Sequence, residues 1–272
     1  MESLEHLETQ AIDAAIKSDW DTAIRLNNAI IKLDKHNSQA ILRLAFAYLQ
    51  TGEYELSKKF YHKALRQHPK LAVARQNLER IEVLEKGKSK PQTVKQAFDP
   101  DLFIETIGKT KSALLCNLGQ KQVLASLYIG EEVVLKIKKR KVEIRTKEAD
   151  AYIGALPDDL SKRLILFIKA KSTYSAYVKE ATLDRVVIFI REEKKGKTVH
   201  HHLSFPTNIQ KNMDQLVNGD TAQPIKTDEN EDEGGDEMDD MSDWEKLVAE
   251  ATEEKEELLD IQTGELDDEE EE

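Results

Sequence analysis

The sequence predicts an α+β protein of several domains. We expect an N-terminal α-helical array, then a small, mostly antiparallel β-barrel-like domain with one or two helices, then a disordered acidic tail. Three observations in the 272 residues support this order: a repeat at an offset of 34 residues, a middle region that alternates apolar and polar side chains, and an acidic end. The predicted boundaries are 1–86 for the helical domain, 87–98 for a linker, 99–208 for the basic β-rich domain and 209–272 for the tail.

The charge of the chain is distributed unevenly. Residues 227–272 carry 24 acidic side chains and 2 lysines, a net charge of −22. Residues 1–85 are neutral, so the entire surplus of +10 in the rest of the chain lies between residues 86 and 226. A basic region of this kind favours an acidic partner, either a nucleic acid or an acidic protein segment.

Several classes of protein are excluded by composition. No apolar run approaches the roughly 20 residues that span a bilayer, and the N-terminal sequence MESLEHLETQ has no signal-peptide pattern. We therefore expect a cytoplasmic protein without membrane contact. The single cysteine, Cys116, excludes an internal disulfide and a cysteine-based zinc site, and its apolar neighbours predict that it is buried.

The first region resembles the tetratricopeptide repeat. At the offset of 34, residues 18–20 align with residues 52–54, and small residues recur at Ala11, Ala23, Ala45, Ser57 and Ala64. The resemblance implies two repeats, at 4–37 and 38–71, followed by a solvating helix at 72–86. The first copy departs from the pattern at Ala14, Asn27 and Lys35. An unrelated pair of helical hairpins with chance periodicity is the alternative.

The same resemblance implies a groove that binds a partner protein. Its register assigns the groove-facing positions to Glu8, Ile12, Ile16, Leu42, Phe46, Leu49, Gln76 and Arg80. The lysines and asparagines with which some family members hold a C-terminal carboxylate are missing. An apolar groove suits an amphipathic helix or an extended apolar segment. The alternative is that so short an array only packs against the next domain.

The pattern of the middle region predicts several strands and one long helix. Alternation predicts strands at 112–117, 122–128, 133–138, 141–146, 151–154, 174–180 and 185–191. A helix is predicted from Asp158 or Asp159 to about Lys169, a short one over 99–106, and an extended segment near 200–204.

The motif Ile153-Gly154-Ala155-Leu156-Pro157 before the helix resembles the second half of a HIRAN-type domain, over residues 142–178. That family has a modified β-barrel, and some of its members bind the ends of single-stranded DNA.

Basic side chains of the middle region form the candidate nucleic-acid site. Cations beside exposed aromatic rings suit single-stranded nucleic acid, because phosphates pair with the cations and bases stack on the rings. A solvated surface that protects the sheet from aggregation is the alternative. The candidate residues are Lys136, Lys138, Lys139, Arg140, Lys141, Arg145, Lys162, Arg163, Lys169, Lys171, Tyr174, Tyr177 and Lys179.

No pattern in the sequence indicates catalysis. The run His200–His202 has no third ligand at a spacing that would complete a metal site, so we expect an exposed polar segment there. Phosphate-binding loops, nucleophile elbows and dinucleotide fingerprints are missing. We therefore expect no enzyme activity, no cofactor and no metal.

The acidic tail contains one amphipathic stretch. Ser242 and Glu245 form a capping-box pattern, and a helix is predicted over 242–259. Its apolar side would anchor a partner through Met241, Trp244, Leu247 and Val248. The alternative is a solubilising tail with an incidental tryptophan.

The function that these features favour is that of a non-enzymatic cytoplasmic adaptor. The short array would bind a protein partner, and the basic β-domain would supply a second contact surface. The alternative is a regulator that binds single-stranded nucleic acid and whose acidic tail competes for its own basic face. The sequence leaves the identity of the partner and the oligomeric state open.

Overall fold

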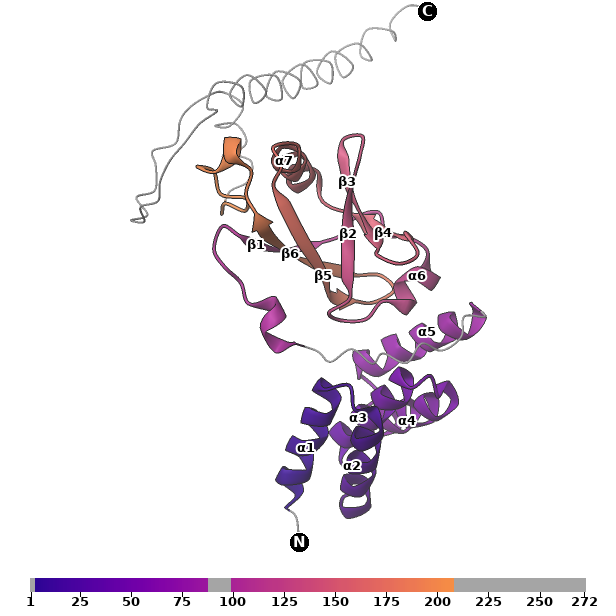
Figure 1. Ribbon diagram of the computed structural model, residues 1–272. Helices are drawn as coiled ribbons and strands as arrows, with labels where there is room; N and C mark the ends of the chain where they lie inside the picture. Colours follow the sequence, from indigo (N-terminus) through magenta and orange to yellow (C-terminus); the bar gives the residue numbers. More distant parts are fainter. Residues whose placement is uncertain (1–2, 88–98, 208–272) are drawn as a thin grey trace, which may run out of the picture.

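The computed structural model describes residues 3–87 and 99–207, and Figure 1 shows them as a group of helices followed by a sheet. The predicted tail, its helix and its anchor residues lie outside the described residues, as does nearly all of the predicted linker. The helices of the first region are α1 (Leu4–Ile16), α2 (Trp20–Leu33), α3 (Ser38–Gln50), α4 (Tyr54–Gln67) and α5 (Ala72–Lys86). They confirm the helical array that the 34-residue offset predicts.

Side-chain caps and small residues explain why these helices form and pack. Ser3, Asp19 and Asn37 each accept a hydrogen bond from a backbone N–H in the first turn of the helix that follows, which satisfies a donor that a helix start leaves unpaired. Each helix packs against the next one along the chain. The small residues buried between them are Ala11, Ala23, Ala40, Ala45, Ser57, Ala64 and Ala74.

A polar contact explains one departure of the first repeat from the family pattern. Asn27, which stands where the second copy has Tyr61, is buried and accepts a hydrogen bond from Arg43 Nε at 3.0 Å. Arg43 also lies 3.5 Å from Glu8, which accepts a further bond from Asn37. Helices α1, α2 and α3 are therefore joined by one polar network.

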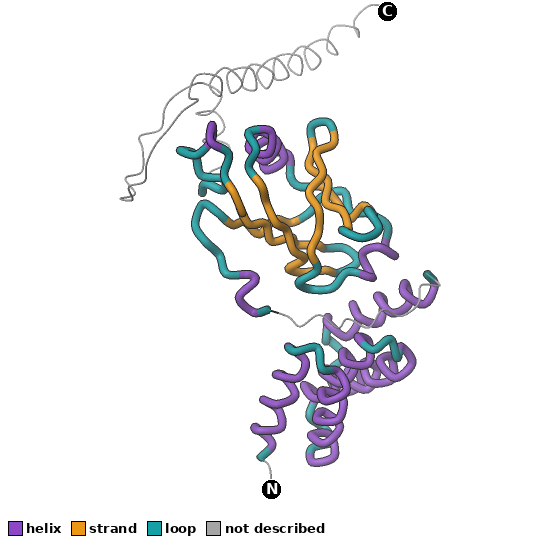
Figure 2. Tube along the Cα trace, viewed as in Figure 1, coloured by secondary structure: helices purple, strands orange, loops and turns teal. Residues whose placement is uncertain are grey.

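The second region is a single antiparallel sheet, drawn in orange in Figure 2. Its strands lie in the order β1-β6-β5-β2-β3-β4. They are β1 (Thr110–Leu114), β2 (Glu132–Lys138), β3 (Lys141–Thr146), β4 (Tyr152–Ala155), β5 (Thr173–Ala181) and β6 (Val186–Lys194). The chain between and around them forms η1 (Pro100–Phe103), α6 (Lys121–Ser126), α7 (Asp158–Lys169) and η2 (Lys197–Val199).

The core of this region lies on one face of the sheet, under α6 and α7. Leu160 and Leu164 of α7 and Leu124 of α6 pack with the inward-facing residues of the strands. Phe189 points to the opposite face, where Phe103 contacts it edge to face, with the ring centroids 5.6 Å apart. The sheet therefore has helices on one face and the η1 segment on part of the other.

The antiparallel β-rich region is confirmed, and its sheet is open rather than closed into a barrel. The residue pair Cys116 and Ala155 forms an isolated bridge between the chain that follows β1 and the strand β4. Strand β1 itself pairs with β6 alone among the described residues. The two edge strands thus meet at a bridge and not along a ladder of hydrogen bonds.

Three local predictions were wrong. Residues 122–128, predicted as a strand, contain helix α6, because the buried residues Leu124, Ala125 and Leu127 follow helical rather than alternating spacing. The helix predicted over 99–106 is the single 3₁₀ turn η1, and the segment predicted as extended near 200–204 follows the 3₁₀ turn η2.

Cys116 is also placed differently from the prediction. Alternation along β1 buries Ala113 and Leu115 and turns Leu114 and Cys116 outward, so the thiol is exposed. The apolar composition around Cys116 therefore did not decide its burial.

Helix α5 of the array contacts helix α6 of the β-domain. The two regions consequently share an interface, visible in Figure 1 where α5 lies beneath α6. No helix in residues 3–87 and 99–207 has the length and apolar character needed to cross a bilayer.

Candidate functional site: the first-helix positions of the array and the basic side chains of the β-domain

Equivalent positions in the three leading helices of the array have different surroundings. Ile12 in α1, Phe46 in α3 and Arg80 in α5 are 34 residues apart. Ile12 is 44% exposed and Phe46 is 37% exposed, whereas Arg80 is bound to the β-domain. The first two positions are accessible to a partner protein, and the third is covered by the chain itself.

An exposed apolar surface lies on α1 and α3. Ile12 and Ile16 are one helical turn apart on α1, and Ile16 is 36% exposed. The ring of Phe46 packs edge to face on Trp20, with the centroids 5.9 Å apart, and this contact holds the exposed ring in place. We call Ile12, Ile16 and Phe46 the apolar face.

The other predicted groove positions of α1, α3 and α5 have mixed surroundings. Glu8 belongs to the polar network with Arg43 and Asn37, so its charge is compensated. Leu42 is half-buried and packs against the core of the second repeat, and Leu49 is buried in that core. Gln76 is exposed on α5. The structure therefore brings Leu42 to the margin of the apolar face and places Leu49 in the interior.

Arg80 joins the array to the β-domain. Its Nε donates a hydrogen bond to the carbonyl of Ala125 at 2.8 Å, and its Nη2 donates one to the carbonyl of Leu127 at 2.6 Å. These carbonyls lie at the C-terminal end of α6, where a cation is favoured by the helix dipole. Sequence periodicity predicts the helix face on which Arg80 lies but contains no signal for these partners.

Burial shifts the pKa of several groups around this contact. Burial raises the pKa of Glu131 above its usual range, although its carboxylate accepts a hydrogen bond from the Tyr128 N–H and is attracted by Arg80. Burial also raises the pKa of Tyr61 and lowers that of Arg80. Tyr61 lies in the core of the array, whereas Arg80 and Glu131 are half-buried, so the interface between α5 and the β-domain is partly closed to water.

The basic hairpin of β2 and β3 is largely neutralised by nearby carboxylates. Lys136 pairs with Asp150 at 2.7 Å, Lys138 with Glu143 at 3.4 Å, and Lys141 with Asp158 at 3.6 Å. Arg145 contacts both Glu143 and Asp150. Burial alone would raise the pKa of Glu143, but hydrogen bonds from Arg145 and Lys138 lower it below the usual value. The hairpin therefore offers fewer free cations than its sequence indicates.

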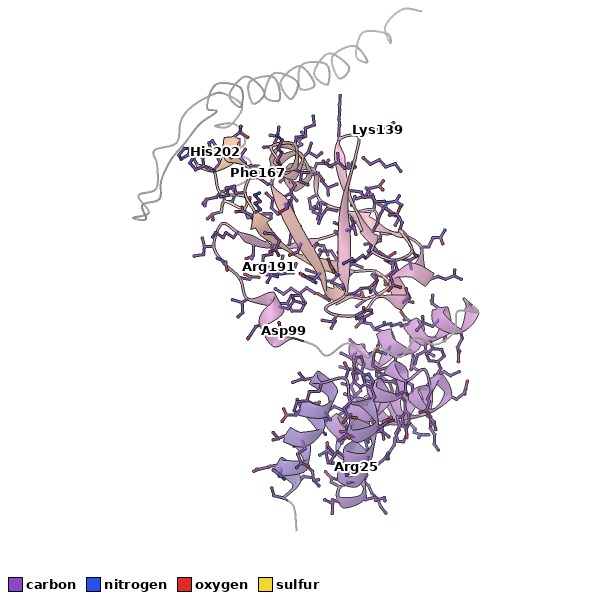
Figure 3. All side chains as sticks on the ribbon, viewed as in Figure 1. Arg25, Asp99, Lys139, Phe167, Arg191 and His202 are labelled. Atoms are coloured by element: carbon purple, nitrogen blue, oxygen red, sulfur yellow. The ribbon has the colours of Figure 1, made fainter. Side chains whose placement is uncertain are left out.

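The tip of the hairpin keeps an exposed lysine. Lys139 occupies the turn with a φ of 54°, next to the exposed Arg140, and Figure 3 shows its side chain pointing away from the sheet. Lys162 is exposed in the first half of α7. Because Lys141 at the start of β3 pairs with Asp158 at the start of α7, the hairpin and this part of α7 are neighbours.

Two other candidate residues hold the β-domain together. Arg163 is fully buried; its Nε donates a hydrogen bond to the carbonyl of Ser204 at 2.8 Å, and its Nη2 donates one to the carbonyl of Leu203. Burial lowers its pKa to about 10, so it stays charged at neutral pH. The Tyr174 hydroxyl lies 2.7 Å from Ser204 Oγ. Both side chains tie α7 and β5 to the segment near residue 204.

The remaining candidates lie on two different surfaces. Lys179 pairs with Glu105 at 3.1 Å and lies over the ring of Phe189, on the sheet face covered by η1. Tyr177 is half-buried beneath Arg191, whose guanidinium carbon is 5.9 Å from the ring centroid. Lys169 and Lys171 are at the other end of the domain, at the end of α7. The structure therefore divides the predicted nucleic-acid site into separate groups.

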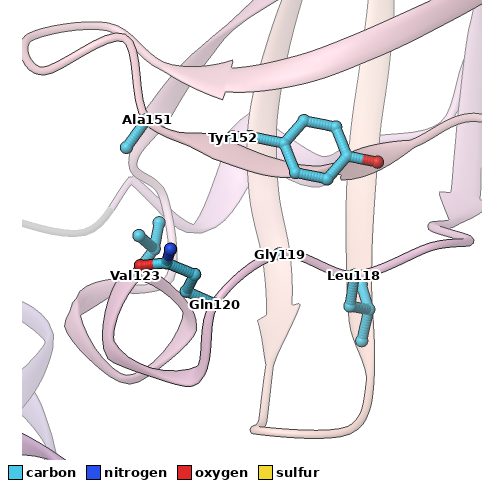
Figure 4. A pocket seen from close by; sticks show the side chains of 6 residues that line it. All are labelled: Leu118, Gly119, Gln120, Val123, Ala151 and Tyr152. Carbon is cyan, nitrogen blue, oxygen red and sulfur yellow. The ribbon is translucent and has the colours of Figure 1, made fainter.

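A pocket of about 570 Å³ lies between α6 and β4 (Figure 4). Gly119 forms part of its wall, where a side chain would collide with the carbonyl of Tyr152, 2.2 Å away. The Tyr152 hydroxyl donates to the carbonyl of Asn117 at 2.7 Å, and burial raises the pKa of this tyrosine. The lining residues are Leu118, Gly119, Gln120, Val123, Ala151 and Tyr152. They supply no acid, base or metal ligand other than this tyrosine.

Sequence reasoning missed one group of basic residues. Lys194 follows directly after the acidic pair Glu192 and Glu193, and with Lys197 it belongs to the run KKGK, which lies beyond the strand predicted at 185–191 and to which we assigned no role. In the described chain, no set of three or more histidine, cysteine or acidic side chains is arranged to hold a metal ion.

Comparison with known proteins supports the interpretation of the array. The tetratricopeptide repeat family matches residues 14–78, from the end of α1 to the middle of α5. No curated protein and no solved structure gives a significant match, and the predicted resemblance of the middle region to a HIRAN-type domain is not supported. Tetratricopeptide repeats are generally non-catalytic and mediate contacts between proteins. The matched family and the observed helices together identify the N-terminal region as similar to a tetratricopeptide array.

Proposed function

We propose that this chain is a non-enzymatic adaptor that binds a partner protein on the apolar face of α1 and α3. The observation that carries the proposal is the exposure of Ile12, Ile16 and Phe46 at the leading-helix positions of the repeats. Full burial of an exposed side chain of this kind contributes about 1.5–3 kcal/mol. Because Ile12, Ile16 and Phe46 are already more than half buried, each can add only part of that value in an interface, and together they supply the apolar centre of a contact.

The chemistry of the face favours an apolar ligand. Glu8 is the acidic residue among the predicted groove positions, and its carboxylate is already paired with Arg43. The charges of Glu8 and Arg43 therefore compensate each other without a charged ligand. The match to the tetratricopeptide family at residues 14–78 supports a protein as the partner. An amphipathic helix or an extended segment that presents apolar side chains fits these conditions best.

Photo-crosslinking from two positions tests this proposal. A benzoylphenylalanine placed at Phe46 should crosslink one partner segment in native lysate, while the same group at Leu56 should not. Leu56 is a matched control because it is 36% exposed but lies on α4, a second helix of a repeat. The crosslinked segment is then synthesised as a peptide and its affinity is measured with the purified chain.

The peptide should lose at least about 30-fold in affinity for Phe46→Glu, the effect of losing a hot spot of about 2 kcal/mol. Leu56→Glu should bind it as the unsubstituted chain does. Equal crosslinking at the two positions, or equal affinity for the two variants, would overturn the proposal. The melting temperatures of both variants are measured, because Phe46→Glu also removes the contact with Trp20.

The β-domain is proposed as the second contact surface. Its hairpin cations are largely engaged with carboxylates of the same domain. The basic residues at the opposite end of α7 are the better candidates for this contact.

A further inference from the structure

Pairing of β5 with β6 brings two basic segments of the chain together. Thr173 at the start of β5 pairs with Lys194 at the end of β6. The Gly196 N–H donates to Ser172 Oγ at 2.9 Å. Only glycine fits at residue 196, because a Cβ there would lie 1.7 Å from the carbonyl oxygen of Ala170. The close approach sets Lys171 beside the segment that contains Lys194 and Lys197.

The turn that follows η2 places two histidines near Lys171, Lys194 and Lys197. Val199 is buried against Leu166, Phe167 and Ala170 of α7 and its end. This contact holds against α7 the turn that carries the exposed His200 and His201, and Figure 3 shows the next residue, His202, near Phe167 of α7. We name this surface the basic corner and define it by Lys171, Lys194, Lys197, His200 and His201.

The lysines of the basic corner lack ion pairs of the kind that neutralise the lysines of the hairpin. None of its three lysines forms an ion pair within the described parts of the chain, whereas three lysines of the hairpin do. Burial lowers the pKa of the adjacent His202, and the charges of Arg163, His201 and Lys195 lower it further. The adjoining carboxylates are engaged elsewhere, Glu192 with Lys195 at 3.7 Å and Glu193 with Arg191 at 3.1 Å, so an acidic ligand would relieve the repulsion among the three lysines of the corner.

We propose that the basic corner binds the acidic run at residues 228–240 of the same chain. This run contains nine acidic residues and no basic residue. The described chain ends at residue 207, which lies five residues after His202, and 20 residues separate that end from the run. A random-coil chain of 20 residues has a root-mean-square span of about 25 Å. A tether of that reach would give the run an effective concentration at the corner in the millimolar range.

An acidic peptide fits the basic corner better than single-stranded nucleic acid. Base stacking requires exposed aromatic rings. Tyr174, the aromatic residue next to the corner, is half-buried; its ring contacts Phe205 and its hydroxyl contacts Ser204. The described surface of the corner thus offers no exposed phenylalanine, tyrosine or tryptophan ring, and its exposed rings are the imidazoles of His200 and His201, whose N–H groups can donate hydrogen bonds to the carboxylates of an acidic peptide.

A spin label in the acidic run tests the proposal with the full chain. Because Cys116 is the only cysteine, the background variant Cys116→Ser leaves Gly235→Cys as the single labelling position. Backbone amide signals of the basic corner should broaden in the ¹⁵N spectrum at about 0.1 M salt, where the screening length is about 10 Å. They should recover at about 1 M salt, where it falls to about 3 Å.

Two triple variants with the same change of charge locate the contact. Lys171→Glu, Lys194→Glu and Lys197→Glu together should abolish the broadening. Lys121→Glu, Lys139→Glu and Lys162→Glu together should leave it unchanged, because these exposed lysines lie outside the corner. The proposal is overturned if both triples act alike or if the broadening appears at Lys139 instead. It is also overturned if the corner shows no broadening at about 0.1 M salt while an oligothymidylate shifts its signals, since the occupant would then be nucleic acid.

Discussion

Arg80 and Arg163 perform the same chemistry in two regions of the molecule. Arg163 is fully buried and Arg80 is half-buried, and each donates hydrogen bonds to two backbone carbonyls more than 35 residues away in sequence. Arg80 joins two regions; burial lowers its pKa, and the negative charge of Glu131 opposes this shift. Arg163 joins two parts of one domain and forms no ion pair with any described carboxylate. A basic residue on a predicted binding surface can therefore stabilise the fold instead of binding a partner.

The difference also predicts what each arginine stabilises. Because Arg163 lies inside the β-domain, its bonds are lost only when that domain unfolds. Because Arg80 lies between two regions, its bonds are lost when the regions separate, without unfolding of either. Variants at the two positions should therefore change different measurements.

The largest effect is expected for Arg163→Met. The change leaves the carbonyls of Leu203 and Ser204 without their donor in a buried site, and each unsatisfied group costs about 1–3 kcal/mol. Removal of the buried charge offsets part of this cost. We expect the free energy of unfolding of the β-domain to fall by about 2–4 kcal/mol, measured by urea denaturation.

The neighbouring Lys162→Met is the control for this prediction. Lys162 is exposed on the same helix, so its replacement should change the free energy of unfolding by less than about 0.5 kcal/mol. If Arg163→Met were as stable as the unsubstituted chain, the bonds of Arg163 would contribute nothing net. Arg163 would then resemble the buried ion pairs that apolar residues can replace without cost.

The fold could be predicted from the sequence wherever a pattern is local. The offset of 34 residues located the helices of the array, and alternation located the strand at 141–146 within its observed bounds. The short helix α6 was missed because six residues are too few for helical and alternating spacing to be told apart. Closure of the sheet could not be predicted either, because it depends on how β1 and β4 meet across the domain.

The candidate site was harder to predict because its residues depend on distant partners. The register of the repeat identified Phe46 and Arg80 as equivalent positions. The carbonyls that accept hydrogen bonds from Arg80, however, lie 45 and 47 residues further along the chain. Likewise, the pairing of β5 with β6 decides that Lys171 and Lys194 are neighbours. Burial of Arg163 could not be distinguished from exposure, since the next residue on α7, Leu164, is buried and the previous one, Lys162, is exposed.

A smaller and local effect is expected for Arg80→Met. The change removes both hydrogen bonds from α5 to the end of α6. Bonds to charged donors contribute about 1.5–3 kcal/mol, so amide exchange in residues 121–127 should accelerate about 10-fold or more. Exchange in β3 and β4 should not change, because the sheet keeps its own bonds. Hydrogen exchange followed by mass spectrometry measures both.

Arg75→Met is the matched control for the interface. Arg75 also lies on α5 and donates to a backbone carbonyl, but its acceptor is Pro69 within the array, at 2.9 Å. Its replacement should leave exchange in α6 unaffected. Equal acceleration in the two variants would mean that α6 responds to any weakening of α5, and the comparison between Arg80 and Arg163 would lose its basis.

The smallest effect is expected for Glu131→Gln, and its sign depends on pH. Burial raises the pKa of Glu131 in the folded protein, so the folded state holds this proton more tightly than the unfolded state does. The stability gained from protonation is complete below the unfolded pKa and is lost as pH rises through the folded pKa. The glutamine variant has no charge to bury. It should therefore match the unsubstituted chain near pH 4 and be more stable than it near pH 7, by urea denaturation at each pH.

The adjacent variant Glu132→Gln is the control, because it distinguishes the effect of burying a carboxylate from the effect of losing an ion pair. Glu132 is exposed and pairs with Lys147 at 2.6 Å, so its replacement removes a surface ion pair and should lower stability slightly near pH 7. The two variants are thus expected to differ in sign. If Glu131→Gln were also less stable near pH 7, attraction by Arg80 would exceed the cost of burying the carboxylate. Arg80 would then act as an ion-pair partner across the interface, and its contrast with the unpaired Arg163 would be larger than the hydrogen bonds alone indicate.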